Sequence, residues 1–442
     1  MNQEKNKNLA LCDAFIRDFQ SFETQLNGQS TTQFHKERIK AISTFAELGF
    51  PTTRDEKWKY TNISSFLKKE FSLAASSKVD KSQIEPFLFD GMQKSRLVFV
   101  NGIFSAELSS LDENNGVVAK SLEAAHKENK EVVEKYLAQH LIFSDQPFAA
   151  LNTAFARDGA FIFVPRNTIA AQPLHLLFIS SSDSVPFHSH PRNLIVLAES
   201  SELQLVESRH FVGDQEQIYF NNFAAEIIVG ANAKLDLVRI QDESKSAFQF
   251  SSLQAKVDRD AHFSFTGVDL GGSISRNDTN IEFTGENAGA QLLGFYYANG
   301  TQLLDNHTFI DHAVPHCNSD ELFKGFMDDQ SHGVFNGAVL VRPDAQKTNA
   351  FQQNQAILIS KDATVDAKPE LEIFADDVLC SHGATIGEIQ EEHLFYLRSR
   401  GIGEEMARAM LHIAFANDIF ERIKIESVRE KLEDEIIKRF SE

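Results

Sequence analysis

One pattern recurs in the middle of this 442-residue chain: GANAKLDL at residues 230–237, DRDAHFSF at 258–265 and GENAGAQL at 285–292. Each stretch has a polar turn, then a small residue, then alternating apolar and polar residues of the kind found in β-strands. The alanines that end the three turns, Ala233, Ala261 and Ala288, are almost evenly spaced. A turn and a strand that recur with a period of about 25 residues predict the rungs of a β-solenoid.

A fourth stretch, SKDATVDA at 360–367, extends the repeat. We interpret the interval from Ala288 to its alanine, Ala363, as three further steps of about 25 residues each. Between residues 160 and 380 apolar and polar residues alternate in short runs that no helical stripe interrupts. A large antiparallel sandwich also has recurring turns, although these come about every 8–12 residues. The spacing favours the solenoid, and the sandwich stays open as the alternative.

Helical patterns lie on both sides of this region. Apolar residues recur at three- and four-residue spacing before residue 50 and again after residue 387, and Ser427-Val-Arg-Glu430 has the form of a capping box that would open the last helix. We expect a mainly β protein with helical ends, divided into a helical region (1–95), a mixed α/β connecting region (96–159), a β-solenoid core (160–383) and a helical region (384–442). A helical cap at each end would cover the open edges of the solenoid.

Composition excludes several classes of function. The net charge of −20 disfavours nucleic acid as a partner, because phosphate-binding proteins usually have the opposite bias. No run of about 18 apolar residues could cross a membrane, and the N-terminus lacks the apolar segment of a secretory signal. Three widely spaced cysteines are typical of a reducing cytoplasm. The GxxxxGK[ST] loop is absent, so we expect no nucleotide to be bound by this chain.

The strongest candidate site is the segment CSHGAT at residues 380–385. In an extended strand, side chains at i and i+2 point to the same face, so Cys380 and His382 would stand about 7 Å apart. Thiolate and imidazole are ligands of soft and borderline transition metals, but a closed site normally has four protein ligands. The pair is therefore half of a metal site, unless a small buried thiol and a polar histidine are neighbours by chance.

Three other candidates are His307, His312 and Lys347. The two histidines lie in DNHTFIDHAVPHC at 305–317, where their five-residue separation places them on opposite faces of a strand. That spacing predicts no single metal site and favours solvated positions. Lys347 is either a partner contact or an ordinary surface residue.

A mixed aromatic and basic segment, FYLRSRG at 395–401, is typical of protein interfaces, which are enriched in aromatic residues and arginine. The alternative is a helix that packs one side and solvates the other. The candidate partner-binding residues are Phe395, Tyr396, Arg398, Arg400 and Gly401.

Three blocks of sequence resemble one known family. PTTRDEKWKYTNISSF at 51–66, AQKTNAFQQNQAILIS at 345–360 and CSHGATIGEIQEEHLFYLRSRGI at 380–402 are similar to signatures of the SufB/SufD family of iron–sulfur cluster assembly scaffold proteins. The resemblance extends almost from end to end of the chain. Gly383 after the histidine, where SufB chains usually have glutamate, and the small number of cysteines favour the SufD branch.

The resemblance implies a right-handed parallel β-helix between helical ends, and a non-enzymatic scaffold in a complex with a SufB-like β-helix protein and the ABC-type ATPase SufC. Cys380 and His382 would face SufB and contribute ligands to a transient iron–sulfur cluster shared with it. The helices that contain Tyr396, Arg398 and Arg400 would dock SufC. A reduced flavin is attributed to the complex, although no motif of this chain indicates it.

Two alternatives come from other classes of protein. Many parallel β-helices are carbohydrate lyases or hydrolases, although these are generally secreted. The chain could also be a homodimeric interaction scaffold that binds no metal, since the edge of one β-helix can pair with a second copy.

Overall fold

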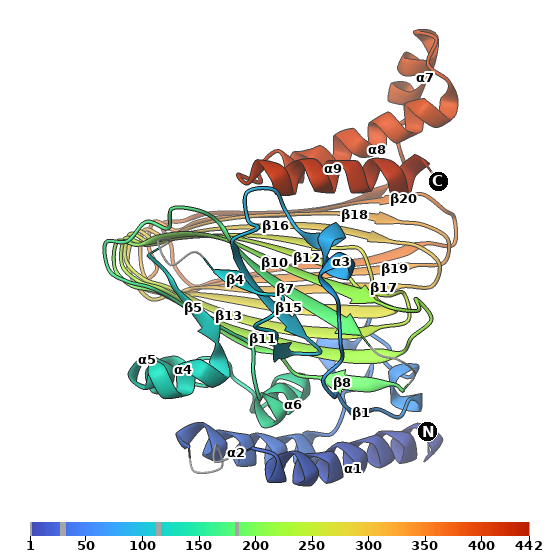
Figure 1. Cartoon of the computed structure of the whole chain (residues 1–442). Helices are drawn as coiled ribbons and strands as arrows, with labels where there is room; N and C mark the ends of the chain where they lie inside the picture. Colours follow the sequence, from blue (N-terminus) through green and yellow to red (C-terminus); the bar gives the residue numbers. More distant parts are fainter. Residues whose placement is uncertain (1, 27–31, 112–115, 182–184, 442) are drawn as a thin grey trace.

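The computed structural model describes residues 2–26, 32–111, 116–181 and 185–441. Two stacked β-sheets form a solenoid of about eight turns, and helices lie against its outside (Figure 1). We name each sheet after its last strand. The β21 sheet and the β22 sheet face one another, and the chain passes from one to the other at every half turn.

Most strands of the solenoid are long and lie in one of these two sheets. The β21 sheet contains β1 (Ser72–Leu73), β5 (Val118–Ser121), β6 (Ala160–Val164), β8 (Phe187–Ser189), β9 (Arg192–Leu197), β11 (Tyr219–Val229), β13 (Phe248–Val257), β15 (Ile274–Phe283), β17 (Leu303–His312), β19 (His332–Val341) and β21 (Thr364–Ile373). The β22 sheet contains β2 (Ser95–Val100), β3 (Ile103–Phe104), β4 (Ser110–Leu111), β7 (Leu174–Ser181), β10 (Glu202–Val212), β12 (Lys234–Asp242), β14 (His262–Asp269), β16 (Gly289–Ala298), β18 (Asn318–Met327), β20 (Asn349–Leu358) and β22 (Leu379–Gly387).

The helices precede and follow these strands. They are α1 (Asn2–Thr24), α2 (Gln33–Leu48), α3 (Lys81–Ile84), α4 (Leu122–Glu128), α5 (Lys130–Tyr136), α6 (Pro147–Phe155), α7 (Glu391–Ser399), α8 (Glu404–Phe420) and α9 (Glu426–Ser441), with short 3₁₀ turns η2 (Glu56–Trp58), η3 (Phe66–Lys68) and η4 (Glu85–Phe87). Among the described helices, none has the length and apolarity needed to cross a membrane.

The solenoid prediction is confirmed, because every pairing from β7 to β22 within the two sheets is parallel. The antiparallel sandwich is thereby excluded. Lys234 aligns with His262 and Asn349 aligns with Leu379 on successive strands of the β22 sheet, so each rung is longer than the repeat predicts. The predicted period of about 25 residues per rung is therefore wrong. Ala363 precedes β21 in the other sheet, so it belongs to the opposite corner of the rung.

The alanine of each repeat marks one corner of the solenoid. Ala233, Ala261 and Ala288 are buried, and the residue before each has a positive φ that turns the chain into the next strand. His316 and Lys347 occupy the same corner in the following rungs, with φ of 64° and 63°. The turn is thus fixed by backbone conformation, and its residue type varies from rung to rung.

Large and small side chains alternate inside the solenoid. Gly294 aligns with Phe323, and Tyr296 aligns with Gly325, on β16 and β18. A Cβ added at Gly294 would lie 2.1 Å from the ring of Phe323, and one at Gly325 would lie 2.2 Å from the ring of Tyr296. These glycines give the two rings the space they occupy.

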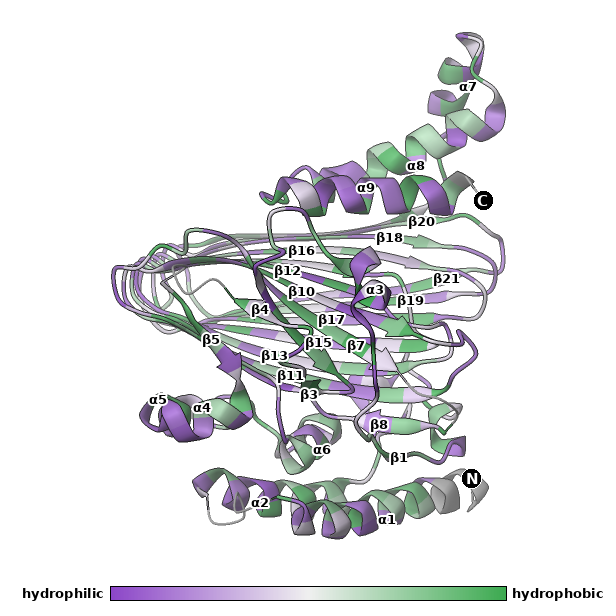
Figure 2. Cartoon of the chain, in the orientation of Figure 1, coloured by the Kyte–Doolittle hydropathy of each residue, from purple (hydrophilic) through white to green (hydrophobic). Residues whose placement is uncertain are grey.

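The helical regions cover the faces of the solenoid and leave its last rung uncovered, so the expected cap at each end is wrong. Apolar residues of α1, α2 and α6 pack on the outer face of the β21 sheet, whereas α8 and α9 pack on the outer face of the β22 sheet. Both polar and apolar residues occur on α2, α8 and α9, as expected of helices that bury one side (Figure 2). Outward apolar residues such as Phe220, Phe250 and Phe295 provide the surface on which these helices pack.

The expected capping box is also wrong. Helix α9 begins at Glu426, so Ser427 lies inside its first turn. The Ser427 hydroxyl donates a hydrogen bond to the carbonyl of Asp90 instead. Nearby, the Lys431 ammonium donates to the carbonyls of Pro86 and Leu88, so α9 is tied to the segment that leads into β2.

A buried ion pair joins the connecting region to the solenoid. Arg192 and Glu226 lie 2.7 Å apart with fully buried side chains. Glu226 also accepts the backbone N–H groups of Ala138, His140 and Leu141. Because a buried charge requires several partners, this carboxylate holds the loop after α5 on the outside of β11.

Replacing Gly294 by alanine should strongly destabilise the protein. The added methyl group would overlap the Phe323 ring, and overpacking of this kind costs about 1–3 kcal/mol or more. The matched control is Gly387→Ala on β22, where an added Cβ meets nothing within 4 Å. Chemical unfolding followed by circular dichroism should show a lower midpoint for Gly294→Ala only. Equal midpoints would contradict the packing described above.

Candidate functional site

Cys380 and His382 lie on β22, the final strand of the solenoid. Cys380 aligns with Ala350 and His382 with Gln352 on β20, and both of those residues are buried. Cys380 packs against the interior core, so the side of β22 that carries Cys380 and His382 is the inward side. The two candidate ligands therefore share one face, as the sequence predicts.

The last rung, formed by β21 and β22, has one open side. In the described part of the chain β21 pairs only with β19, and β22 pairs only with β20. Large apolar side chains are exposed around this rung, including Leu379 at 67% and Phe374 at 62%. Added Cβ atoms at Gly383 and Gly387 would meet nothing within 4 Å. Unpaired strand edges beside exposed apolar residues are typical of a surface to which another chain binds.

The chemistry of Cys380 and His382 differs. Burial raises the pKa of the Cys380 thiol, and a backbone hydrogen bond at Ala350 partly opposes this effect. The thiol is therefore protonated at neutral pH, and a metal ion would have to displace its proton. His382 is exposed, so its imidazole is accessible from outside the solenoid. Among the described residues no group of three or more potential metal ligands occurs, at this pair or elsewhere.

A buried carboxylate lies two strands before His382. Glu321 on β18 accepts a hydrogen bond of 2.7 Å from the Gln352 amide, and both side chains are inside the solenoid. Burial raises the pKa of Glu321 to about 7, with a further contribution from Asp320, while the nearby Thr308 hydroxyl and the hydrogen bond from Gln352 oppose the rise. Sequence reasoning missed this group. The sequence signal that could have revealed it is the pair Asp320-Glu321. Side chains alternate along a strand, so one of two adjacent acidic residues must point inward.

The two histidines of the second candidate cluster point to opposite faces of β17. His307 lies outward beside Asp305, with 3.0 Å between Nε2 and Oδ1. His312 is buried, shares a hydrogen bond of 2.9 Å with the Ser319 hydroxyl, and is not the solvated residue that we expected. Burial raises the pKa of Cys317 to about 11, which makes it a core thiol.

Lys347 occupies the corner between β19 and β20. Its backbone N–H donates to the Asp377 carbonyl at 2.7 Å, and its ammonium lies 2.5 Å from the Asp377 carboxylate. Both side chains are largely exposed. The residue is thus a surface corner close to the last rung.

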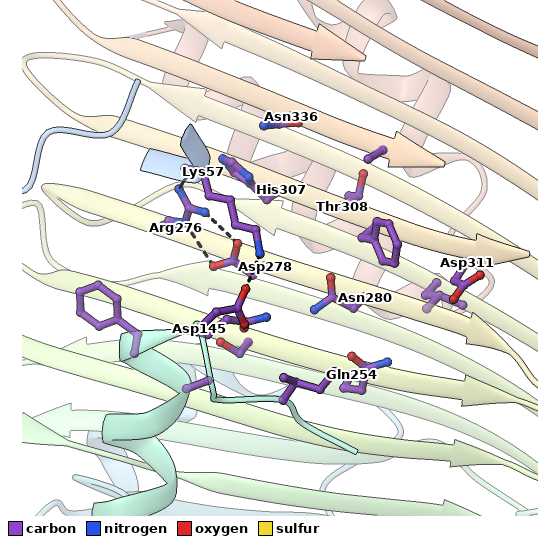
Figure 3. Close-up of a pocket in the computed structure, with 18 of the residues that line it drawn as sticks. Lys57, Asp145, Gln254, Arg276, Asp278, Asn280, His307, Thr308, Asp311 and Asn336 are labelled. Atoms are coloured by element: carbon purple, nitrogen blue, oxygen red, sulfur yellow. Dashed lines mark hydrogen bonds and ion pairs between the residues drawn. The ribbon is translucent and has the colours of Figure 1, made fainter. Parts of the chain in front are cut away.

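A groove on the outer face of the β21 sheet was not predicted from the sequence (Figure 3). At its edge Arg276 is buried, contacts Asp278 and Asp305 at 2.9 Å each, and stacks on Trp58 at 3.8 Å. Burial alone would raise the pKa of Asp305, but His307 and Arg276 lower it to about 2. The Thr61 hydroxyl also donates to Asp305. The N-terminal PTTRDEKWKYT block is therefore anchored on β15 and β17.

This groove does not fit a flavin nucleotide. Each of its four basic side chains is already paired with a carboxylate: Lys57 with Asp145, Arg276 with Asp278 and Asp305, His307 with Asp305, and Arg342 with Asp311. The remaining charged residues that line it, Glu282 and Glu370, are acidic. The acidic residues would repel an anionic phosphate there. The described residues of the lining offer no unpaired cation to bind it.

The candidate interface residues of the C-terminal region lie mainly on α7, which extends away from the solenoid (Figure 1). Phe395 and Tyr396 are 74% and 58% exposed, and Met406 and Met410 on α8 are exposed as well. Arg398 pairs with Glu404 at 3.1 Å, whereas Arg400 stacks near Tyr396. Gly401 ends the helix with a φ of 85°. The structure thus brings the predicted residues together on one projecting element.

The fold defines the class of protein, a parallel β-solenoid with helices packed on the outer faces of both sheets. Two family models match the sequence: the SufBD protein N-terminal region at residues 10–176, and the SUF system FeS cluster assembly SufBD core domain at residues 178–415. The chain belongs to the SufBD family of the SUF iron–sulfur cluster assembly system.

Curated relatives agree with this assignment. An iron–sulfur cluster assembly SufBD family protein of Synechocystis sp. is 32% identical, over 93% of this chain and 92% of the relative. The iron–sulfur cluster assembly protein SufD of Escherichia coli is 30% identical, over 87% of this chain and 88% of its own length. SufD of Bacillus subtilis is 26% identical, over 89% and 91%. These matches support a SufD-like member of the family.

Glu321 should make stability depend on pH. An unfolded glutamate has a pKa of about 4.5, below the value of about 7 in the fold, so its contribution is fully present below pH 4.5 and is lost as the pH rises through 7. Glu321→Gln removes this titration. Relative to the wild type, we expect little change at pH 5 and a gain on the order of 3 kcal/mol at pH 8.

Denaturant unfolding at the two pH values measures this effect. Glu286→Gln provides the control, because it makes the same chemical change at an exposed position outside the interior of the solenoid. A Glu321→Gln variant whose difference from the wild type is the same at pH 5 and pH 8 would show that Glu321 titrates as an ordinary carboxylate.

Proposed function

We propose that this chain is a non-enzymatic scaffold subunit for iron–sulfur cluster assembly that pairs, through its last rung, with a second β-solenoid chain of the SufB type. Membership of the SufBD family supports the process. The observation that carries the pairing is the uncovered last rung, where the two candidate ligands lie beside an unpaired strand edge.

Backbone geometry supports this mode of pairing. The Leu379 N–H donates to the Thr348 carbonyl at 2.9 Å, so the backbone groups of Leu379 face β20. Parallel strands alternate the direction of these groups, and those of Cys380 and His382 therefore face the unpaired edge. A strand of a partner chain that added to β22 would continue the ladder and would lie next to both residues.

The cluster would be cargo shared between the two chains. His382 would supply an imidazole and Cys380 a thiolate, while the remaining ligands would come from the SufB-type chain. This division agrees with the lack of any three-ligand group among the residues that the structure describes. Docking would also exclude water from the exposed apolar residues of the last rung, which strengthens metal–ligand interactions. The three free cysteines suit a reducing cytoplasm.

The C-terminal helices would bind an ATPase of the SufC type. Phe395 and Tyr396 project from α7, and exposed aromatic residues are frequent anchors of interfaces. Helices α8 and α9 pack on the β22 sheet through Ile419, Phe420 and Leu432, and Lys324 of β18 forms an ion pair with Asp418 of α8. Movement of a bound ATPase would therefore reach the sheet that ends in β22.

Two variants of β22 separate docking from ligation. Ala384→Pro removes an N–H that faces the unpaired edge, so binding to the SufB-type chain should weaken about tenfold or more while the fold persists. His382→Ala should leave binding intact and lower the iron and sulfide retained per complex. Anaerobic co-purification followed by iron and sulfide analysis measures both effects.

Matched controls lie on the same strand. Thr385→Pro removes an N–H that faces β20 and should destabilise the last rung itself. Ser381→Ala changes an exposed residue between the two candidate ligands and should alter neither binding nor cluster content. Wild-type iron and sulfide content in the His382→Ala complex would refute the ligand role, and formation of a metal-free homodimer alone would refute the shared site.

Phe395→Asp should abolish capture of the SufC-type ATPase, because it replaces the more exposed of the two aromatic side chains on α7 by a charge. Pairing with the SufB-type chain should persist. Ile169→Asp is the control, since Ile169 is similarly exposed but belongs to a turn of the solenoid. Pull-down with tagged ATPase measures binding, and equal capture by both variants would place the ATPase elsewhere.

A further inference from the structure

A column of side chains inside the solenoid ends at His382. The aligned residues on β16, β18, β20 and β22 are Leu292, Glu321, Gln352 and His382. Glu321 and Gln352 are only 1% and 2% exposed, whereas His382 lies on the open side. Neighbouring strands are about 4.8 Å apart, so the Gln352 amide is the nearest polar group below the imidazole in this column.

Two contacts fix the orientation of the Gln352 amide. Its Nε2 donates to Glu321 Oε2 at 2.7 Å. Across the interior, Gly337 on β19 leaves the space that this nitrogen occupies, since a Cβ at that position would lie 2.3 Å from Nε2. The amide nitrogen is thus held toward the interior, and the oxygen remains for another partner.

That oxygen, Gln352 Oε1, is buried and has no hydrogen-bond partner within the described part of the chain. A buried acceptor without a donor costs about 1–3 kcal/mol. The residue that follows Gln352 in the column is a histidine, whose ring always carries at least one N–H donor. Histidines that bind metals usually donate their second ring nitrogen to an oxygen, which fixes the tautomer and the ring orientation.

We infer that Gln352 positions His382, with Oε1 accepting the N–H of one ring nitrogen so that the lone pair of the other is directed out of the last rung toward iron. Glu321 acts one step further back, because it holds the amide that holds the imidazole. Gln352 itself touches neither iron nor sulfide. This inference rests on the proposed ligand role of His382 and adds the residue that would make the imidazole ready to bind.

Nitrogen NMR of the histidine rings tests the inference directly. The full chain, labelled with ¹⁵N-histidine, is measured in complex with SufB-type and SufC-type partners before iron is added, and His382→Ala identifies the resonances. The wild type should show a single ring tautomer at His382. Gln352→Met, which keeps the length of the side chain but removes both polar atoms, should give a mixture of tautomers and slow cluster assembly about tenfold or more.

Two further variants separate positioning from stability. Asn354 is a second buried amide on β20, but it aligns with Ala384, so Asn354→Leu should lower stability and leave the His382 tautomer unchanged. Exchanging the two groups in Glu321→Gln/Gln352→Glu keeps an amide N–H donating to a carboxylate and keeps an oxygen acceptor at position 352, and should restore the single tautomer that Gln352→Met loses. Rescue by this variant is a result that a purely structural role of Gln352 does not predict.

The outcomes separate the positioning role of Gln352 from the ligand role of His382 on which it rests. A tautomer mixture in the wild-type complex, or a single tautomer retained in Gln352→Met, would overturn the role of Gln352. The wild-type spectrum decides even if Gln352→Met fails to fold. Normal assembly by His382→Ala together with a single wild-type tautomer would instead overturn the ligand role and leave the contact with Gln352 standing.

Discussion

Parallel backbone pairing between successive rungs is the constraint on which the structure depends. Each strand from β7 to β20 satisfies its N–H and C=O groups with the strand before it and the strand after it, whereas β21 and β22 have only the strand before. A solenoid has no closing strand, so its end must be covered by another element or by another molecule. Here the helices pack elsewhere, and the site, the candidate ligands and the proposed partner all belong to that end.

The helices give the two sheets different roles. Outward apolar residues of the β21 sheet receive α1, α2 and α6, and those of the β22 sheet receive α8 and α9. The N-terminal block around Trp58 and Thr61 is anchored by Arg276 and Asp305, far along the chain. As a result both outer faces of the solenoid carry helices, α7 projects beyond the helices on the β22 sheet, and the last rung, which bears Cys380 and His382, stays free.

Periodicity predicted much of this structure, because alternation along a strand is a local property. It predicted the solenoid, the helical ends, the shared face of Cys380 and His382 and the opposite faces of His307 and His312. It could not predict where the helices pack, since that depends on outward residues such as Phe250 and Phe295 from many rungs. The predicted step of about 25 residues failed because Ala363 lies at the opposite corner of the rung from Ala233, Ala261 and Ala288, so the interval from Ala288 is not a whole number of turns. The contact of Glu321 with Gln352 joins neighbouring rungs and is visible only once the register is known.

The packing of α8 and α9 across the β22 sheet has a mechanical consequence. Every rung is bonded to its neighbours along the whole length of its strands, so the solenoid resists shear and bends very little. If an ATPase binds α7 as proposed, force applied there would reach the sheet through the apolar contacts of Phe295, Phe326 and Phe420. The chain would then move as one piece, and the free rung could be shifted relative to a paired subunit without any strand of this chain being unfolded.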